Sequence, residues 1–299
     1  MAPTNFENPL SGRLFVVALP IGHPNDLSPH AREVLGVVPR IACEDTRVTR
    51  RVLQKHGITP PTLVSYHDHN EERRVPGLVA SLTGGEDLAL VSDAGTPLVA
   101  DPGYRLVVAA IEAGVEVRSV PGPCAAIAAL AASGLPSDRF LVLGFLARDA
   151  GGRRSRLAEH EGTAATLVLY EAPRRVSALL ADVVEVLGPS RRIAVANDLT
   201  KTWECWWRGT AAEVAAALAD HEARGEFTVV VQGASRRSAR TGAIDLVVER
   251  LITELVRAGM SASSVRDVVA RVYDVPRRDA YQLALARIQQ QRAADAHEE

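Results

Sequence analysis

The stretch Asp87–Pro97, DLALVSDAGTP, contains the pattern that decides the fold. Its first part, Asp87–Ser92, is a short apolar run of strand type, and Gly95 and Pro97 then close a tight turn. A buried strand that ends in such a loop is typical of open α/β sheets, which bind ligands beyond the carboxyl ends of their strands. We therefore expect a parallel strand followed by a ligand-binding loop.

The same alternation extends through the first half of the chain. Apolar runs of strand type are separated by segments with helical spacing, such as Thr46–His56 and Tyr104–Ala113, and this pattern predicts a parallel α/β sheet. Its strands are expected at Arg13–Leu19, Thr62–Tyr66, Asp87–Ser92 and Val115–Val120. The alanine-rich segment Cys124–Ser133 predicts a buried helix.

A second series of elements has a more mixed pattern, because its last two strands flank one helix and carry polar residues at alternate positions. Strands are expected at Phe140–Phe145, Thr166–Tyr170, Arg192–Ala196, Trp203–Gly209 and Phe227–Gln232, and helices at Arg153–Glu161, Val176–Leu187 and Ala211–Ala223. After a polar linker near Arg236, the pattern predicts three helices at Asp245–Arg257, Ser264–Val272 and Arg277–Gln290.

These patterns predict an α/β fold with two α/β domains and a small C-terminal helical module. A chain of 299 residues is long enough for about two domains with separate cores. The expected divisions are a flexible N-terminus at 1–12, domains at 13–134 and 135–235, the helical module at 236–292 and a tail at 293–299.

The composition excludes several classes of protein. With 47% hydrophobic residues and a net charge of −2, the chain is neither disordered nor fibrous. It has no apolar run of roughly 18 residues and no signal-peptide pattern at Met1–Gly12, so we expect a soluble, cytoplasmic protein without membrane association. The three cysteines are far apart, which argues against disulfides and thiolate zinc sites. The glycine-rich fingerprints GxGxxG and GxxxxGK[ST] are absent, so ordinary dinucleotide and P-loop sites are not expected.

Two more loops at strand ends, Leu19–His23 and Pro121–Cys124, combine proline and glycine and would let a ligand approach the backbone closely. Each loop alone is also explained as a tight turn, but three together predict a binding site. They belong to an ordered series of motifs: Pro20-Ile21-Gly22, Glu44-Asp45-Thr46-Arg47, Ser65-Tyr66-His67, Val91–Pro97, Asp101-Pro102-Gly103, Pro121-Gly122-Pro123, Leu199-Thr200-Lys201 and Gly225-Glu226-Phe227. Over about Gly12–Gly233 the chain therefore resembles the ribosomal RNA small-subunit methyltransferase I family, in the tetrapyrrole-methylase superfamily.

The resemblance implies S-adenosylmethionine-dependent 2′-O-methylation of a cytidine in the decoding region of 16S rRNA. It also implies a homodimer that acts on 16S rRNA or the small ribosomal subunit and holds the cofactor between its two α/β domains. The cofactor-binding residues carried over by motif are Pro20, Asp93, Gly95, Thr96, Gly122, Cys124, Ala125, Tyr170, Glu171 and Leu199.

The chain departs from the family pattern near the expected pocket. It has Leu19, His23, Cys124 and Asn197-Asp198 where the family usually has Thr, Asn, Ser and Arg-Glu. Leucine removes a hydrogen-bonding group and cysteine weakens one, so cofactor affinity or substrate orientation is expected to differ.

Lys201 is a candidate catalytic residue because the chain has only two lysines among its 34 basic residues. A buried amine with a lowered pKa could accept the proton of a ribose hydroxyl, or a charged one could stabilise the alkoxide, whereas a salt bridge to Asp198 is the structural alternative. Glu44 and Arg47 are further catalytic candidates, although helix capping explains Glu44-Asp45-Thr46 equally well.

Substrate contacts are expected from a polar loop and a basic helix face. The candidates are Tyr66, His67, Asn70, Arg50 and Arg51, and clustered positive charge suits a phosphate-rich substrate. His67-Asp68-His69 lacks a third ligand cluster, so no metal site is predicted. Two alternative functions remain open: methylation of a tetrapyrrole ring carbon, and RNA binding by a catalytically inactive ribosome-assembly factor.

Overall fold

The computed structural model describes residues 11–219, 221, 224–234, 248–273, 275 and 277–298. The chain forms two compact units, one of residues 1–156 and 166–232 and the other of residues 157–165 and 233–299. Most of the expected N-terminal segment and the linker near Arg236 lie outside the described residues. The domain boundaries within the chain therefore stay predictions.

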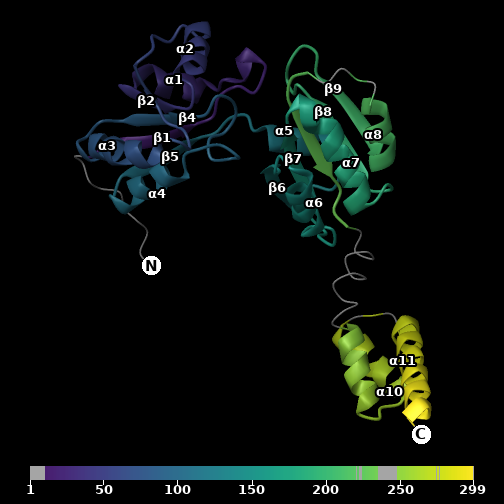
Figure 1. The fold of residues 1–299 in the computed structure, drawn as a ribbon. Helices are drawn as coiled ribbons and strands as arrows, with labels where there is room; N and C mark the ends of the chain where they lie inside the picture. Colours follow the sequence, from purple (N-terminus) through teal and green to yellow (C-terminus); the bar gives the residue numbers. More distant parts are fainter. Residues whose placement is uncertain are drawn as a thin grey trace. The chain divides into compact units, whose positions relative to one another are not determined.

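The first sheet in the larger unit is entirely parallel, with strand order β3-β2-β4-β1-β5. Its strands are β1 (Arg13–Val17), β2 (Arg40–Cys43), β3 (Thr62–Ser65), β4 (Leu88–Val91) and β5 (Glu116–Val120). The connecting helices are α1 (Pro29–Val37), α2 (Thr46–Lys55), α3 (Glu71–Thr83) and α4 (Tyr104–Glu112), and α5 (Ala125–Ser133) follows β5 (Figure 1). The predicted parallel sheet is confirmed, but β2 was not predicted.

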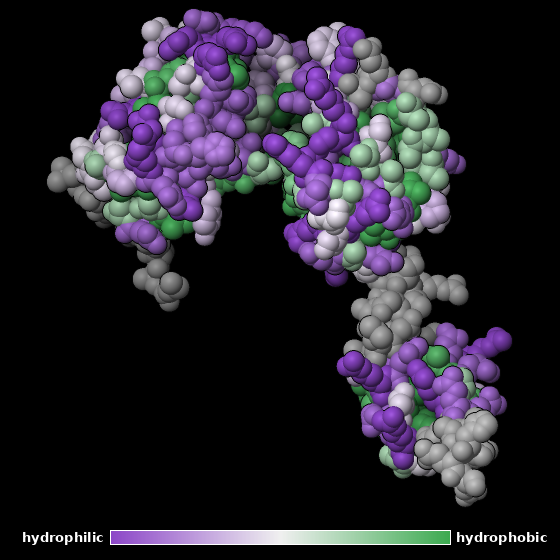
Figure 2. All heavy atoms as spheres, in the orientation of Figure 1, coloured by the Kyte–Doolittle hydropathy of each residue, from purple (hydrophilic) through white to green (hydrophobic). Residues whose placement is uncertain are grey.

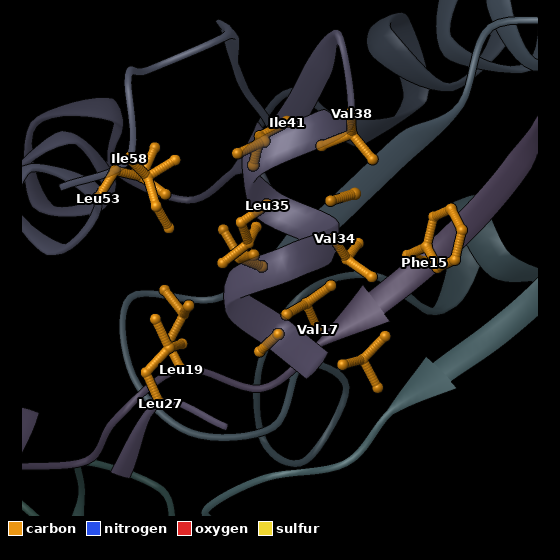
Figure 3. Close-up of a cluster of buried hydrophobic side chains, with 14 of the residues drawn as sticks. Phe15, Val17, Leu19, Leu27, Val34, Leu35, Val38, Ile41, Leu53 and Ile58 are labelled. Atoms are coloured by element: carbon orange, nitrogen blue, oxygen red, sulfur yellow. The ribbon is translucent and has the colours of Figure 1, made fainter. Parts of the chain in front are cut away.

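Both faces of this sheet are buried because its strands are apolar at successive positions. Phe15 and Ala89 lie in one hydrophobic cluster, while their chain neighbours Leu14 and Leu88 lie in the other. Figure 3 shows the first cluster, in which α1 side chains such as Leu35 meet those of β1 and β2. The loops that lead to α2, α4 and α5 follow the carboxyl ends of β2, β4 and β5.

The second sheet is mixed, as the sequence predicted, with strand order β6-β7-β10-β8-β9. Its strands are β6 (Phe140–Phe145), β7 (Thr166–Glu171), β8 (Arg192–Asn197), β9 (Cys205–Thr210) and β10 (Phe227–Val231). Only the β6–β7 pairing is parallel among these described strands. The helices are α6 (Ala150–Ala158), α7 (Val176–Leu187) and α8 (Ala211–Ala219), and two short 3₁₀ turns lie at η1 (Pro24–Asp26) and η2 (Pro173–Arg175).

Helix α5 follows the last strand of the first sheet and packs its apolar side chains against the second sheet. Ala126, Ala129 and Leu130 are buried in a cluster with Val168 of β7 and Val230 of β10. Figure 2 shows hydrophilic residues over much of the part of the molecule that contains α1 to α4, and paler hydrophobic colour over the alanine-rich α8. The apolar face of α5 is therefore buried inside the larger unit.

The smaller unit has its own helical core. Residues 248–257 are helical, followed by α10 (Ala262–Val272) and α11 (Arg277–Glu298). Buried side chains from all three helices, including Ile252, Val265 and Ala284, form one cluster. The three predicted helices are present, and α11 is longer than Arg277–Gln290, since it includes most of the residues assigned to a tail. No helix in the described part of the chain is long and apolar enough to span a membrane.

Candidate active site

A cavity of about 420 Å³ lies where the loops after β2, β4 and β5 meet elements of the second sheet. A cavity of this size suits a small-molecule ligand. The first-sheet side of the wall consists of Ile21, Glu44, Asp93–Thr96, Val99–Asp101, Cys124 and Ala125. The second-sheet side consists of Phe145, Tyr170–Pro173, Leu199 and Gly225–Thr228. Most of the predicted cofactor-binding residues therefore share one cavity, whereas Pro20 and Gly122 do not line it.

The three proline- and glycine-containing loops are joined to one another by hydrogen bonds. The amide of Leu19 donates to the carbonyl of Gly95 over 2.9 Å, and the amide of Gly95 donates back over 3.0 Å. The Thr96 hydroxyl donates to the carbonyl of Pro123 over 2.9 Å. Gly95 has a φ of +76°, and a Cβ there would lie 3.3 Å from Ile21 Cγ2. This position therefore requires glycine.

Three of the carboxylic acids that line the cavity, Glu44, Asp93 and Asp101, come from the loops of the first sheet. Burial, reinforced by the charge of Asp93, raises the pKa of Glu44. Burial also raises the pKa of Asp93, although its Oδ1 accepts a hydrogen bond from the amide of Asp45 over 3.0 Å. Burial and the charge of Glu44 raise the pKa of Asp101 to about 7. The motif Asp101-Pro102-Gly103 belongs to the family resemblance, but Asp101 was not among the predicted site residues.

The second-sheet wall contains Tyr170 and Glu171. The Tyr170 hydroxyl accepts a hydrogen bond from the amide of Ala126 over 3.0 Å, and it thus satisfies a free amide in the first turn of α5. Glu171 is neutralised by Arg175, whose Nε lies 2.7 Å from Oε1 and whose Nη2 lies 2.9 Å from Oε2. The sequence did not predict Phe145 or Gly225–Thr228, which reach the cavity through strand pairing.

Lys201 does not line this cavity. Its Nζ lies 2.5 Å from Asp198 Oδ1 and 3.4 Å from Glu226 Oε2. Desolvation opposes the charge, but the hydrogen bond with Asp198 and both carboxylate charges prevail and raise the pKa of Lys201. The raised pKa keeps the amine protonated, which disagrees with the neutral-base form of the prediction, and the ion pairs with Asp198 and Glu226 match the salt-bridge alternative. That the charged amine stabilises the alkoxide stays a prediction.

In the Glu44-Asp45-Thr46-Arg47 motif, one residue caps a helix and another lines the cavity. Asp45 is the N-cap of α2, and its Oδ1 accepts a hydrogen bond from the amide of Arg47 over 2.7 Å. The Arg47 side chain is 79% exposed and pairs with Asp45, outside the cavity. Glu44 alone of the candidates in this motif lines the cavity.

The expected substrate residues have different environments. Tyr66 is only 1% exposed and its hydroxyl donates to Glu71, so the expectation that it contacts substrate is wrong. His67 and Asn70 bond to each other, with the His67 amide 3.0 Å from Asn70 Oδ1. Arg50 and Arg51 are exposed on α2. Within the described residues, no group of three or more His, Cys, Asp or Glu is arranged for a metal ion.

The four departures from the family pattern also occupy distinct places. Leu19 is fully buried, and the His23 side chain caps η1. Asn197 donates to the carbonyls of Arg224 and Glu226 over 2.8 and 3.2 Å, which fixes the loop that precedes β10. Only Cys124 among these departures lines the cavity.

Comparison with known proteins supports the motif-based resemblance. The family model for tetrapyrrole (corrin/porphyrin) methylases matches residues 13–215. The ribosomal RNA small subunit methyltransferase I of Micromonospora olivasterospora is 47% identical over 273 residues, covering 91% of this chain and 86% of the relative. The chain belongs to the ribosomal RNA small subunit methyltransferase I family.

Other members of the ribosomal RNA small subunit methyltransferase I family show similar agreement. The protein from Mesorhizobium japonicum is 45% identical, covering 83% of this chain and 84% of the relative. The protein from Escherichia coli O157:H7 is 42% identical, covering 92% of this chain and 95% of the relative. The family predicted from the motifs is therefore confirmed.

Solved structures confirm the predicted tetrapyrrole-methylase fold. The methyltransferase CobJ matches with a TM-score of 0.57 and 22% identity, covering 75% of this chain and 95% of CobJ. A uroporphyrin-III C-methyltransferase from Thermus thermophilus, complexed with S-adenosylhomocysteine, matches with a TM-score of 0.53 and 20% identity, covering 73% of this chain and 97% of that protein.

Proposed function

We propose that this chain methylates the ribose 2′-oxygen of a cytidine in the decoding region of 16S rRNA, with S-adenosylmethionine as the methyl donor. The observation that carries this proposal is the convergence of the family's motif loops on one cavity. Curated relatives named for ribosomal RNA small-subunit methylation support the RNA substrate.

The residues around the cavity fit S-adenosylmethionine in both shape and chemistry. The two-way Leu19–Gly95 bridge keeps glycine, without a side chain, at the wall. Asp93 offers a carboxylate to ribose hydroxyls or an ammonium group, and Tyr170 and Leu199 offer apolar surface. The first turn of α5, at Cys124 and Ala125, favours an anionic group. When bound, the cofactor supplies an electrophilic methyl group on a positively charged sulfur.

The chain must also hold a phosphate-rich substrate near this cavity. Arg50 and Arg51 are exposed on α2, and the carboxyl end of β2, just before this helix, carries Glu44 to the cavity. Their charges would attract RNA phosphates and weaken binding as salt rises. His67 and Asn70 are proposed as neighbouring polar contacts. Action on ribosomal RNA in bacteria would place the protein in the cytoplasm.

The decisive experiment is mass mapping of 16S rRNA from cells with and without the gene. We expect loss of one 2′-O-methyl group in the decoding region, and restoration by the wild-type gene but not by an Asp93→Ala gene. An unchanged methylation pattern would overturn the proposal. Intact methylation combined with an assembly defect would instead support the inactive assembly factor, and methylation of a tetrapyrrole by the purified protein would support the other alternative.

We also propose a homodimer, on the basis of β6. This strand lies at the edge of the second sheet and exposes 39% of Leu141 and 37% of Val142. Exposed apolar edge strands are rare in monomers, and a second copy offers the same surface. Leu141→Glu should lower the mass measured by light scattering to that of a monomer, whereas Ile111→Glu, an equally apolar exposed change on α4, should not. A monomeric wild-type protein would refute the dimer.

A further inference from the structure

Like Glu44 and Asp93, Asp101 lines the cavity without an ion-pair partner among the described residues. The charged groups that act on it are all carboxylates, from three separate loops: Glu44 after β2, Asp68 after β3 and Asp93 after β4. The Ser92 hydroxyl, which donates to the Ala94 carbonyl over 3.1 Å, favours the charged form of Asp101 and partly offsets these effects. In contrast, Glu171 is neutralised by Arg175 and Glu226 faces Lys201.

The backbone around Asp101 holds this carboxylate in a constrained place. Leu98 and Ala100 have φ values of 71° and 67°, a left-handed conformation that is strained for residues with a side chain. Gly103 has a φ of 140°, and a Cβ there would lie 2.8 Å from Leu90 Cδ2. Strain of this kind persists only where the surrounding structure enforces it, and it is concentrated at functional sites.

This loop is also fitted to the second sheet. A Cβ on Gly144 would lie 3.2 Å from Ala100 Cβ, and the pairing of β6 with β7 shifts register between Val142 and Gly144. The absence of a side chain at Gly144 thus leaves room for Ala100, the residue that precedes Asp101. Both features keep the Asp101 carboxylate at the cavity wall.

We propose that Asp101 is the general base that removes the proton from the substrate hydroxyl, an inference that rests on the proposed function. Asp101 accepts the proton of the 2′-hydroxyl as the oxygen forms its bond to the methyl carbon. The carbon–sulfur bond breaks with its electron pair left on sulfur, and Asp101 then returns the proton to water. Each atom, charge and electron pair is thereby accounted for.

The acid–base properties of the site agree with this role. A carboxyl group with a pKa of about 7 is half ionised at neutral pH and is a better base than an ordinary aspartate. Lys201 has a raised pKa and stays protonated, and burial raises the pKa of Tyr170, so neither is ready to accept a proton. Glu171 has its negative charge balanced by Arg175.

The test compares wild type with Asp101→Asn in single-turnover methylation of small ribosomal subunits at saturating cofactor. We expect the wild-type rate to rise with pH through a midpoint near pH 7 and to level off above it, and the variant to lose about 10²–10⁴-fold in rate together with this inflection. Glu44→Gln removes a charge that raises the pKa of Asp101, so its inflection should move to lower pH.

Two measurements separate a base from a cofactor ligand. Calorimetry should give the same affinity for S-adenosylmethionine in Asp101→Asn and wild type, within about threefold, whereas Asp93→Asn should bind more weakly. The ¹³C NMR titration of the free protein should contain one carboxyl signal with a midpoint near 7 that Asp101→Asn removes.

Three results would overturn the proposal. One is an Asp101→Asn rate within about tenfold of wild type, and another is a pH inflection that survives in this variant. The third is a loss of cofactor affinity with an unchanged rate at saturation, which would make Asp101 a cofactor ligand. Wild-type protein that methylates no RNA would overturn the proposed function and the role of Asp101 with it, while an active wild type isolates the failure to Asp101.

Discussion

Replacing Asp182 by alanine should destabilise the protein, because it leaves the buried guanidinium of Arg153 without its carboxylate partner. The side chains of Asp182 and Arg153 are 3% and 7% exposed, and Arg153 Nε lies 2.6 Å from Asp182 Oδ2. Without the carboxylate, Arg153 keeps its hydrogen bond to the Arg148 carbonyl but no balancing charge from this residue. Removal of one partner from a buried ion pair costs about 3–5 kcal/mol, and this is the loss we expect in the free energy of unfolding.

A matched control lies one turn further along α7. Glu185 is 57% exposed and pairs with Arg154, which also contacts Asp182, so Glu185→Ala should cost only about 0–1 kcal/mol. Urea unfolding can be followed by tryptophan fluorescence, because Trp206 and Trp207 lie in β9 of the same sheet layer. The argument that burial makes this ion pair costly to break would be refuted by equal losses of unfolding free energy in the two variants, or by a loss below about 1 kcal/mol for Asp182→Ala.

Three further predictions concern the site. Lys201→Arg should keep its single-turnover rate within about threefold of wild type, because arginine preserves the charge beside Asp198, and a hundredfold loss would restore the catalytic hypothesis. Asp93→Ala should weaken cofactor binding by about ten- to a hundredfold in calorimetry, since a charged hydrogen-bond acceptor is lost, and equal affinity would remove Asp93 from the site. The folded state raises the pKa of Asp101 from 3.8 to about 7, so the folded protein binds more protons than the unfolded chain in this window and loses stability as pH rises. From about pH 5 to about pH 8, the free energy of unfolding of Asp101→Asn should therefore rise by about 1 kcal/mol relative to that of wild type, after allowance for the partial exposure of Asp101. Urea unfolding of both proteins at the two pH values tests this, and the same difference in midpoint at both would contradict it.

The sequence predicted the elements with strong periodicity and missed those that depend on context. The four-residue strand Arg40–Cys43 follows the apolar end of α1 after only Val38 and Pro39, so no separate alternation marks it. Helix α6 begins at Ala150 instead of Arg153, because Asp149 Oδ1 accepts the amide hydrogen bond of Gly152 and organises the first turn. The mixed character of the second sheet was visible in its polar alternation.

Site residues were predictable where a motif fixes the backbone, as at Gly95. Residue roles that depend on distant partners were not. The scarcity of lysine identified Lys201 as constrained, but only the fold reveals Asp198 and Glu226 as its partners. Tyr66 stands beside polar residues in the sequence, yet its ring enters the core. The charge environment of Asp101 likewise arises from loops far apart in the sequence.

The position of α5 has a consequence for how the protein unfolds. This helix follows the last strand of the first sheet and packs on β7 and β10, and the Ala126 amide in its first turn donates a hydrogen bond to the Tyr170 hydroxyl. A ligand held at Cys124, Ala125 and Tyr170 therefore binds only when both sheets are folded. Because the cofactor binds only the folded state, it should raise the melting temperature of both sheets together by mass action. Any separate thermal transitions of the two sheets should then merge into one. Bound cofactor would thus make the unfolding of the whole larger unit cooperative.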